Sequence, residues 1–234
     1  MADPYLRCPA AWLRGTLEPD PALGLIERVD TGGTPATTTA EFWDGDVLWL
    51  TPKEIARSGR GLHVTQTERT ITQLGLQSSG AKLLAPGTVM LTKRAPVGAV
   101  AVAAAPMATN QGFLNFTCGP HLRPLYLAYW LTANRPYLDL VANGSTYPEL
   151  YKGDLFELEI AAPALDTQDR IIDFLASLEF VALLGLPLEQ STVDPSRMPA
   201  IHEQTRRLRE LRDKLLPAVM SGEVDLARLA GKVA

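Results

Sequence analysis

The chain has 234 residues, of which 46% are hydrophobic and 21% are charged, enough for one large domain or one domain with an appendage. Its formal net charge of -4 argues against a general nucleic-acid binder, but leaves room for a focused basic surface or for a partner that carries much of the phosphate contact. No apolar run approaches the roughly 20 residues of a membrane-spanning helix. The first five residues lack the pattern of a secretory signal, and the two cysteines, Cys8 and Cys118, lack metal-type spacing. We therefore expect a cytoplasmic protein with reduced thiols and no membrane association.

The first part of the chain predicts short elements separated by turns. Thr51, Pro52 and Glu54 form a helix-start signature, with an N-cap, a proline at the first helical position and a glutamate at the third. Asp44 and Asp46 flank Gly45, where they could bind a cation, although shaping a turn is the simpler interpretation. The predicted elements are a strand over 25–29, a strand over 47–50, a short helix from Pro52 that ends at 58–61, and a capped helix within 70–76 that ends at Gly75.

The centre of the chain predicts buried strands around a polar turn. We expect strands over 88–92 and 97–104, and a turn at Asn110-Gln111-Gly112 that leads into a third strand. Amides both donate and accept hydrogen bonds, so Asn110 and Gln111 could lock neighbouring loops or read the edge of a nucleic-acid base. Locking is the simpler interpretation, because buried polar groups normally find partners inside the protein.

After this turn the pattern predicts a largely buried helix over 125–131, extending toward Asn134, and a second short helix over 136–141. The alternation of Phe156, Leu158 and Ile160 with Glu157 and Glu159 then indicates a half-exposed strand over 155–161.

The composition changes after Pro163. Asp166 and Thr167 could cap a helix, Gly185 and Pro187 would end it, and 187–199 reads as a loop before a second helix that ends at 221–222. The apolar residues on the narrow stripes of these helices are Ile171, Leu175, Leu178 and Ala182 on the first, and Ile201, Leu208, Leu211 and Leu215 on the second. So narrow a seam needs a partner, which could be the rest of the chain, a second copy or another protein.

These patterns predict the α+β class, with a mixed α/β domain over 1–163 followed by a helical hairpin or coiled-coil region over 164–234. Residues 223–226 could add a short strand or a docking tail.

Motifs that mark common active sites are missing from the sequence. It holds no glycine-rich phosphate loop, no Gly-x-Ser-x-Gly elbow, no zinc-type spacing around His63, His121 or His202, and no amino-methyltransferase or nuclease motif. We therefore expect a protein that is not an enzyme and that has no metal or cofactor of its own.

Several short motifs, each weak alone, occur together in a specific order. They are Gly32-Gly33-Thr34-Pro35, Glu41-Phe42-Trp43, 47–52, Ile71-Thr72, Gly75-Leu76, Ser79-Gly80-Ala81, 83–89, 92–98, Thr109-Asn110-Gln111-Gly112-Phe113, Gly144-Ser145-Thr146, Pro163, Gln168, Ile171, 211–216 and Ser221-Gly222. In this order the chain resembles the specificity (S) subunit of type I DNA restriction–modification systems, over nearly its whole length.

The resemblance implies that 1–163 is a target-recognition domain that reads one half of a split DNA site, while 164–234 acts as spacer and docks methyltransferase subunits. A full family member carries two such domains and two helical regions. This chain resembles a half-subunit, so two copies pairing their helices as a homodimer would read a palindromic split site. Unlike the unbroken spacer helix of the family, the helices here are interrupted at 185–199.

The implied partners are double-stranded DNA, the methyltransferase subunits and the restriction/translocase subunit, in a system of phage defence. AdoMet is expected only on the methyltransferase.

Candidate DNA contacts follow from the chemistry of phosphate and base-edge recognition. The candidate phosphate contacts are Lys53, Arg57, Arg60, Lys93, Arg94 and Lys152. The candidate base readers are His63, Gln66, Thr67 and Arg69 on the polar loop 60–69, followed by Gln77, Ser78 and Lys82. The dimer or docking residues would be Ile171, Leu175, Leu178, Ile201, Leu208, Leu211 and Leu215. Asn110, Gln111, Ser145 and Thr146 are assigned to locking of the scaffold.

Two other interpretations stay open. The chain could be an orphan docking or decoy protein that binds a methyltransferase without reading DNA, which its acidic balance favours. It could also be an enzyme with an unrecognised site, which would need a cleft of perturbed carboxylates.

Overall fold

The computed structural model describes residues 11–58, 62–94, 96–142, 148–184, 210–211 and 213–222, with the main chain alone at 56–58 and 177–184. The chain divides into two units: Leu13–Ala162, here the larger unit, and a smaller unit formed by Pro163–Ala234 with the first twelve residues. Within the described ranges, no helix is both long and apolar enough to cross a membrane. The same ranges hold no group of three or more His, Cys, Asp or Glu side chains placed to bind a metal.

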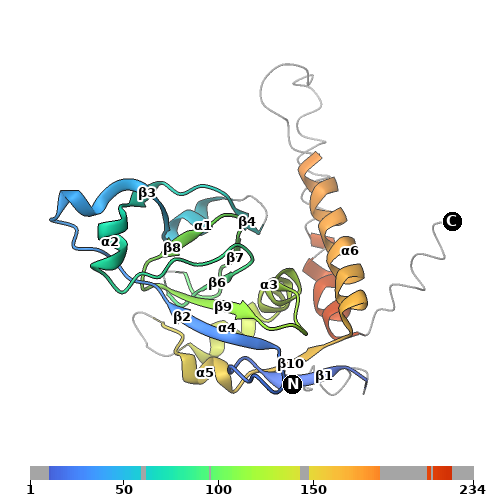
Figure 1. The fold of residues 1–234 in the computed structure, drawn as a ribbon. Coiled ribbons are helices and arrows are strands. Elements are labelled where there is room, and N and C mark those ends of the chain that lie inside the picture. The colour runs from blue at the N-terminus through green and yellow to red at the C-terminus, as the bar shows by residue number, and fades with distance from the viewer. Residues whose placement is uncertain are drawn as a thin grey trace, which may run out of the picture. The chain divides into compact units, whose positions relative to one another are not determined.

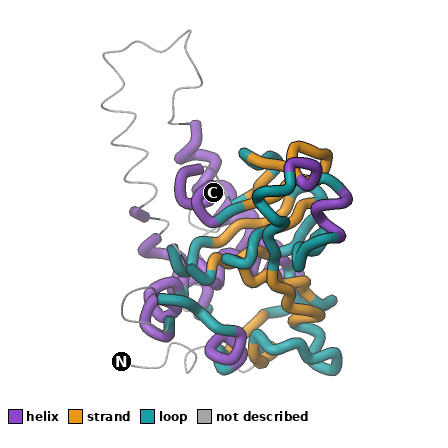
Figure 2. Tube along the Cα trace, turned by 90° about the vertical axis from the view of Figure 1, so that its left-hand side faces the viewer, coloured by secondary structure: helices purple, strands orange, loops and turns teal. Residues whose placement is uncertain are grey.

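Short elements joined by many loops make up the larger unit, as Figure 2 shows in orange, purple and teal. In chain order they are β1 (Leu13–Thr16), β2 (Ile26–Thr31), the 3-10 helix η2 (Ala40–Phe42), β3 (Trp43–Leu50), α1 (Pro52–Ser58), β4 (His63–Val64), β5 (Arg69–Ile71), α2 (Gln73–Gln77), β6 (Val89–Thr92), β7 (Val100–Ala103), β8 (Met107–Thr109), β9 (Phe113–Cys118), α3 (Pro124–Ala133), α4 (Arg135–Val141), α5 (Lys152–Phe156) and β10 (Glu159–Ala162). The mixed α/β architecture predicted for this part of the chain is confirmed.

Three sheets organise the larger unit (Figure 1). A five-stranded sheet has the order β2-β9-β6-β7-β4, a three-stranded sheet has the order β5-β3-β8, and β1 pairs with β10. Most pairs are antiparallel, but β4 runs parallel to β7 and β8 runs parallel to β3. These parallel pairs join segments that are distant in sequence. In Figure 1, α1 and β4 lie toward one end of the unit, and α5, β1 and β10 lie at the other.

The helix α3 is buried on every side. Residues Tyr126 to Leu131 are all buried, and α3 contacts both β6 and β7. The Tyr126 hydroxyl donates to the carbonyl oxygen of Ala161 at 2.9 Å, which connects α3 to β10. Since no side of α3 faces water, its sequence carries no amphipathic period, as predicted for a helix within the core.

Several predicted boundaries are wrong for local reasons. Gly75 lies inside α2 and does not end it, because Thr72 accepts the Gly75 N–H at 3.0 Å and the helix continues to Gln77. A Cβ on Gly75 would lie 2.3 Å from the Phe42 carbonyl oxygen, so close packing explains this glycine. The strand predicted from residue 97 starts at Val100, since Gly98 has a φ of 75° and turns the chain.

The strand predicted over 155–161 is partly a helix. Lys152–Phe156 forms α5, and the Tyr151 N–H donates to the Asp154 carboxylate at 3.1 Å, which caps the first turn. Only Glu159–Ala162 pairs as a strand, with β1. The alternation of apolar and acidic residues that predicted one strand therefore covers the end of α5 and the start of β10.

Asp44 and Asp46 shape a bulge, as the simpler interpretation expected. Trp43 and Val47 are both opposite Ile71, so residues 44–46 loop out of β3, and Asp44 adopts a φ of 59°.

The smaller unit contains α6 (Leu165–Leu184), which confirms the first predicted helix. Residues 210–211 and 213–220 are also helical, and Gly222 adopts a φ of 74° directly after the helix ends, as predicted. The loop 187–199, the helix start near Pro199 and residues 223–226 lie outside the described residues. The coiled-coil assignment stays a prediction.

Candidate nucleic-acid interface

A junction between residues 32–34, which follow β2 of the five-stranded sheet, and residues 109–112, which link β8 of the three-stranded sheet to β9, joins these two sheets; we call it the glycine junction. The Gly33 N–H donates to the Thr109 carbonyl at 2.9 Å, and the Trp49 indole N–H donates to the Gly33 carbonyl at 3.0 Å. A Cβ on Gly32 would lie 2.2 Å from the Thr109 carbonyl oxygen. Two main chains therefore approach so closely here that glycine is required.

The amides of the glycine junction are used inside the protein. The Asn110 Oδ1 atom accepts the Gly112 N–H at 2.8 Å, and the Gln111 Oε1 atom accepts the Thr34 hydroxyl at 2.5 Å. The predicted locking between loops is seen for Gln111, although this residue is exposed, whereas the Asn110 side chain fixes its own turn. Ser145 and Thr146 lie outside the described residues.

A second segment, the α1–β5 edge (residues 51–69), presents polar side chains at one end of the larger unit. Glu54 organises it: one carboxylate oxygen accepts the Thr51 N–H at 2.8 Å and the Thr51 hydroxyl at 2.7 Å. The other oxygen accepts the Glu68 N–H at 2.6 Å. The helix start predicted from Thr51, Pro52 and Glu54 is thus confirmed, and the same carboxylate fixes the loop before β5.

Three predicted contacts on this edge are exposed: Lys53, His63 and Gln66. Lys53 lies in the first turn of α1, and His63 lies on β4, the edge strand of the five-stranded sheet. Within the described residues, none of these three side chains forms a hydrogen bond or ion pair. The side chain of Arg57 and the whole of Arg60 lie outside the described residues.

Thr67 and Arg69 differ from these three. The Thr67 hydroxyl accepts the Trp49 N–H at 3.2 Å and donates to the Arg69 carbonyl at 2.7 Å, so it is engaged within the protein. The Arg69 guanidinium carbon lies 3.6 Å from the centroid of the Trp43 ring, while the residue remains exposed. The Thr67 hydroxyl is thus already used inside the protein, whereas Arg69 remains accessible to a ligand.

Lys93 and Arg94 share one carboxylate. Lys93 Nζ lies 2.8 Å from Glu149 Oε1, and Arg94 Nη1 lies 3.4 Å from Glu149 Oε2. The hydrogen bond from Lys93 lowers the pKa of Glu149, against the effect of its burial. Lys93 is only 18% exposed and Arg94 is 46% exposed, so Arg94 is the more accessible cation of the two.

A second pair of cations surrounds Asp30 on β2. Arg28 Nε and Lys82 Nζ each lie 2.6 Å from one oxygen of the buried Asp30 carboxylate. Burial raises the pKa of Asp30, but the hydrogen bonds from Lys82 and Arg28 outweigh it and hold this pKa below its ordinary value. Lys152 donates to the neighbouring Val29 carbonyl at 2.8 Å, which gives it a structural contact.

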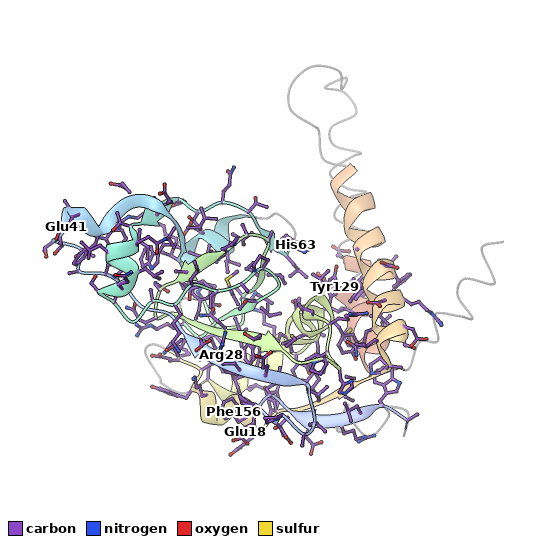
Figure 3. All side chains as sticks on the ribbon, in the orientation of Figure 1. Glu18, Arg28, Glu41, His63, Tyr129 and Phe156 are labelled. Carbon is purple, nitrogen blue, oxygen red and sulfur yellow. The ribbon has the colours of Figure 1, made fainter. Side chains whose placement is uncertain are left out.

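The predicted contacts therefore fall into separate groups. Lys53, His63, Gln66 and Arg69 belong to the α1–β5 edge, whereas Lys152 lies on α5 at the opposite end of the larger unit (Figure 1). Figure 3 shows Arg28 on β2 well below the end that carries His63 on β4. The other two predicted readers, Gln77 and Ser78, are exposed at the end of α2.

The sequence of residues 23–183 matches the family model of the type I restriction modification DNA specificity domain. That match covers most of the chain. The chain belongs to this family. Members are specificity subunits and not catalytic subunits, which confirms that the chain is not an enzyme.

Two curated relatives of the specificity family match in sequence. The MjaIX specificity subunit of Methanocaldococcus jannaschii is 37% identical over 153 residues, which are 64% of this chain and 35% of that protein. The HindI specificity subunit of Haemophilus influenzae is 24% identical over 206 residues, which are 87% of this chain and 41% of that protein. The chain thus spans well under half the length of each relative.

Solved structures share the fold of this specificity-family chain. A chain from a type I R-M system structure has a TM-score of 0.59 at 23% identity, covering 92% of this chain and 47% of that one. The HsdS subunit from Thermoanaerobacter tengcongensis has a TM-score of 0.54 at 19% identity, covering 92% and 46%. At these identities the similarity describes the fold alone.

The predicted docking residues have different accessibilities. Ile171 and Leu175 on α6 are buried. Leu211 is 46% exposed and Leu215 is half-buried, while Leu216, Val219 and Met220 form the buried side of the last helix. The side chain of Leu178, and all of Ile201 and Leu208, lie outside the described residues. Among the predicted docking residues whose side chains the structure describes, Leu211 is therefore the most accessible to a partner.

Arg28 belongs to a charged group and Trp43 to a stacked group, and neither role was predicted from the sequence. Arg28 and Asp30 are two residues apart on one strand, a spacing that puts side chains on the same face and was a usable signal. The contact of Trp43 with Arg69 joins a bulge to an edge strand, and no spacing in the sequence indicates it.

Proposed function

We propose that this chain reads one half of a split DNA site as a non-catalytic specificity subunit and docks methyltransferase subunits. The observation that carries the proposal is the family match over residues 23–183, which includes most of the larger unit. The proposal places the protein in the cytoplasm, in a system of phage defence, with AdoMet bound only by the methyltransferase and the restriction/translocase subunit as a further partner.

The α1–β5 edge supports the proposed reading role. Lys53 offers a cation for a phosphate, and His63, Gln66 and Arg69 offer donors and acceptors for base edges. The Glu54 bonds to Thr51 and Glu68 tie the start of α1 to the residue before β5 before DNA arrives. A reading surface of this kind needs exposed polar groups on a fixed main chain.

The charge of this edge sets how strongly it can hold DNA alone. Residues 51–69 carry Lys53, Arg57, Arg60 and Arg69 against Glu54 and Glu68, a formal net charge of only +2, so the edge is not strongly basic. Since phosphate contacts supply most of the non-specific affinity of DNA-binding proteins, we propose that the methyltransferase subunits carry much of that contact. Isolated chain should bind DNA weakly, and the complex tightly.

We further propose that two copies pair through the helices of 165–220 and read a palindromic split site. The exposed Leu211 supports this, because an apolar side chain in solvent on a helix can pack against a second copy. The mass of the purified chain at micromolar concentration tests this part. A monomer would contradict it, and L211E should shift a dimer toward monomer.

Co-expression with a type I methyltransferase subunit tests the reading role. Adenine methylation across the host genome, mapped by long-read sequencing, should reveal a split motif only when both proteins are present. A palindromic motif supports the homodimer. A stable complex between the two proteins without any new motif would contradict DNA reading and favour the docking or decoy role.

A further inference from the structure

Two tryptophans form a fixed aromatic platform beneath the α1–β5 edge. The Trp43 indole N–H donates to the Ala36 carbonyl at 3.1 Å, and the Trp49 indole N–H donates to the Gly33 carbonyl at 3.0 Å. Their ring centroids lie 5.1 Å apart with an interplanar angle of 86°, an edge-to-face contact. Both residues are buried, so the ring of Trp43 has one defined position.

Arg69 lies on this platform. Its guanidinium carbon is 3.6 Å from the Trp43 centroid and 5.9 Å from that of Trp49. The Arg69 main chain is fixed as well, because it pairs with Trp49 in the three-stranded sheet and its carbonyl accepts the Thr67 hydroxyl. Within the described residues, the guanidinium forms no ion pair or hydrogen bond, so its N–H groups are available to a ligand.

We propose that Arg69, held on Trp43, reads a guanine through its O6 and N7 atoms in the major groove; this inference rests on the proposed function. A guanidinium is a planar fork whose paired donors match the two guanine acceptors. Stacking restricts the side chain before binding, so less conformational freedom is lost when the fork meets the base. Trp43 is the positioning residue.

The comparison with Lys53 supports a base rather than a phosphate as the ligand. Lys53 is an exposed point charge on a flexible stem, without a fixed neighbour in the described residues, and a phosphate accepts such a cation from many directions. Arg69 has the opposite properties: its position is defined by a ring and a strand. Directional geometry contributes to reading a base edge and adds little to neutralising a phosphate.

The test uses the complex with methyltransferase subunits and duplexes that carry its motif. Each guanine of the half-site is replaced in turn by 7-deazaguanine, in which carbon replaces N7. The wild-type complex should bind one of these duplexes about tenfold more weakly, since one of two hydrogen bonds is lost. R69A should weaken binding to the unmodified site by about tenfold to a hundredfold and should no longer distinguish that 7-deaza duplex.

R69K and W43F give further readouts. R69K keeps the charge but not the fork, so it should also lose the preference at that single base pair. W43F keeps an aromatic face without the indole N–H bond, so it should reduce the preference at the same position only. K53A is the matched control, and should weaken binding to all duplexes equally. Thermal unfolding of each variant separates loss of fold from loss of contact, and the 7-deaza duplexes need only the wild-type protein.

Three results would overturn the inference. The wild-type complex could bind every 7-deaza duplex equally, or R69K could keep the full motif. R69A could also weaken all duplexes alike and reduce the salt dependence by about one charge, which would make Arg69 a phosphate contact. A wild-type complex with no motif at all would instead reject the proposed function.

Discussion

The glycine junction and the α1–β5 edge are both rich in polar residues, yet they use them in opposite ways. In the junction, Gln111 accepts the Thr34 hydroxyl of the other segment, and Asn110 accepts the Gly112 N–H of its own turn. On the edge, Lys53, His63 and Gln66 are exposed and have no side-chain partner among the described residues. Residue type alone does not separate the two regions, because an amide or hydroxyl suits either task. The internal partners of each side chain do separate them.

The largest loss of stability should come from adding a side chain to the glycine junction. In G33A, the new Cβ would lie 2.3 Å from the Ala81 nitrogen and 2.4 Å from the Gly80 carbonyl carbon, both main-chain atoms that cannot move aside. We expect a loss of about 3 kcal/mol in the free energy of unfolding, measured by urea denaturation.

G80A is the matched control for this comparison. A Cβ on Gly80 would meet no atom within 4 Å, so the free energy of unfolding should change by about 0.5 kcal/mol or less. Equal losses in the two variants would show that the junction is not selectively intolerant of side-chain bulk.

A smaller loss of stability is expected at Asp30. Its carboxylate is buried, as the junction is, but it is paired with two exposed cations. D30N should destabilise the protein by about 1–3 kcal/mol at neutral pH, because the charged hydrogen bonds from Arg28 and Lys82 weaken.

The pH dependence of Asp30 has a defined sign. Its pKa is lower in the folded protein than its ordinary value of 3.8, so its contribution is complete above that value and is lost as the pH falls below it. Unfolding measured from pH 6 down to pH 2 should therefore show a smaller acid-induced loss in D30N than in wild type. The exposed Asp46 provides the control variant D46N, and equal acid sensitivity of D30N and wild type would contradict the prediction.

The smallest effect on stability should come from the edge itself. K53A should change the free energy of unfolding by about 0.5 kcal/mol or less, since the exposed Lys53 side chain lacks a described partner. If Lys53 contacts a phosphate, the slope of log affinity against log salt for the methyltransferase complex should fall by about one. An unchanged slope would remove Lys53 from the interface.

The sequence predicted features whose cause lies within a few residues. The start of α1 followed from Thr51, Pro52 and Glu54, and the buried α3 followed from its continuous apolar sequence. The strand predicted over 155–161 was wrong because alternation continued across the end of α5, although Asp154 three residues after Tyr151 was a helix signal.

The candidate site was predicted less completely, because its organisation depends on contacts between distant segments. Lys82 is 52 positions from Asp30, and Arg94 is 55 positions from Glu149, so neither pair leaves a local pattern. The engaged hydroxyl of Thr67 and the stacking of Arg69 likewise depend on Trp49 and Trp43 in a neighbouring strand. A list of polar residues gives the chemistry that is available, and only the fold shows which of it is already in use.

The pairing of β1 with β10 constrains the order of events during synthesis. Leu13 lies opposite Ala162 in this ladder, so the first strand of the larger unit waits for its partner until the last strand has left the ribosome. The Tyr126 hydroxyl waits a shorter time, because the carbonyl of Ala161 follows it by 35 positions. Because the ladder joins the two ends of the unit, β1 stays unpaired through most of the synthesis of the unit, whereas α3 can pack on β6 and β7 as soon as it forms. Truncation just before β10 should therefore produce a chain captured by chaperones, and extension by a few residues past Ala162 should release it.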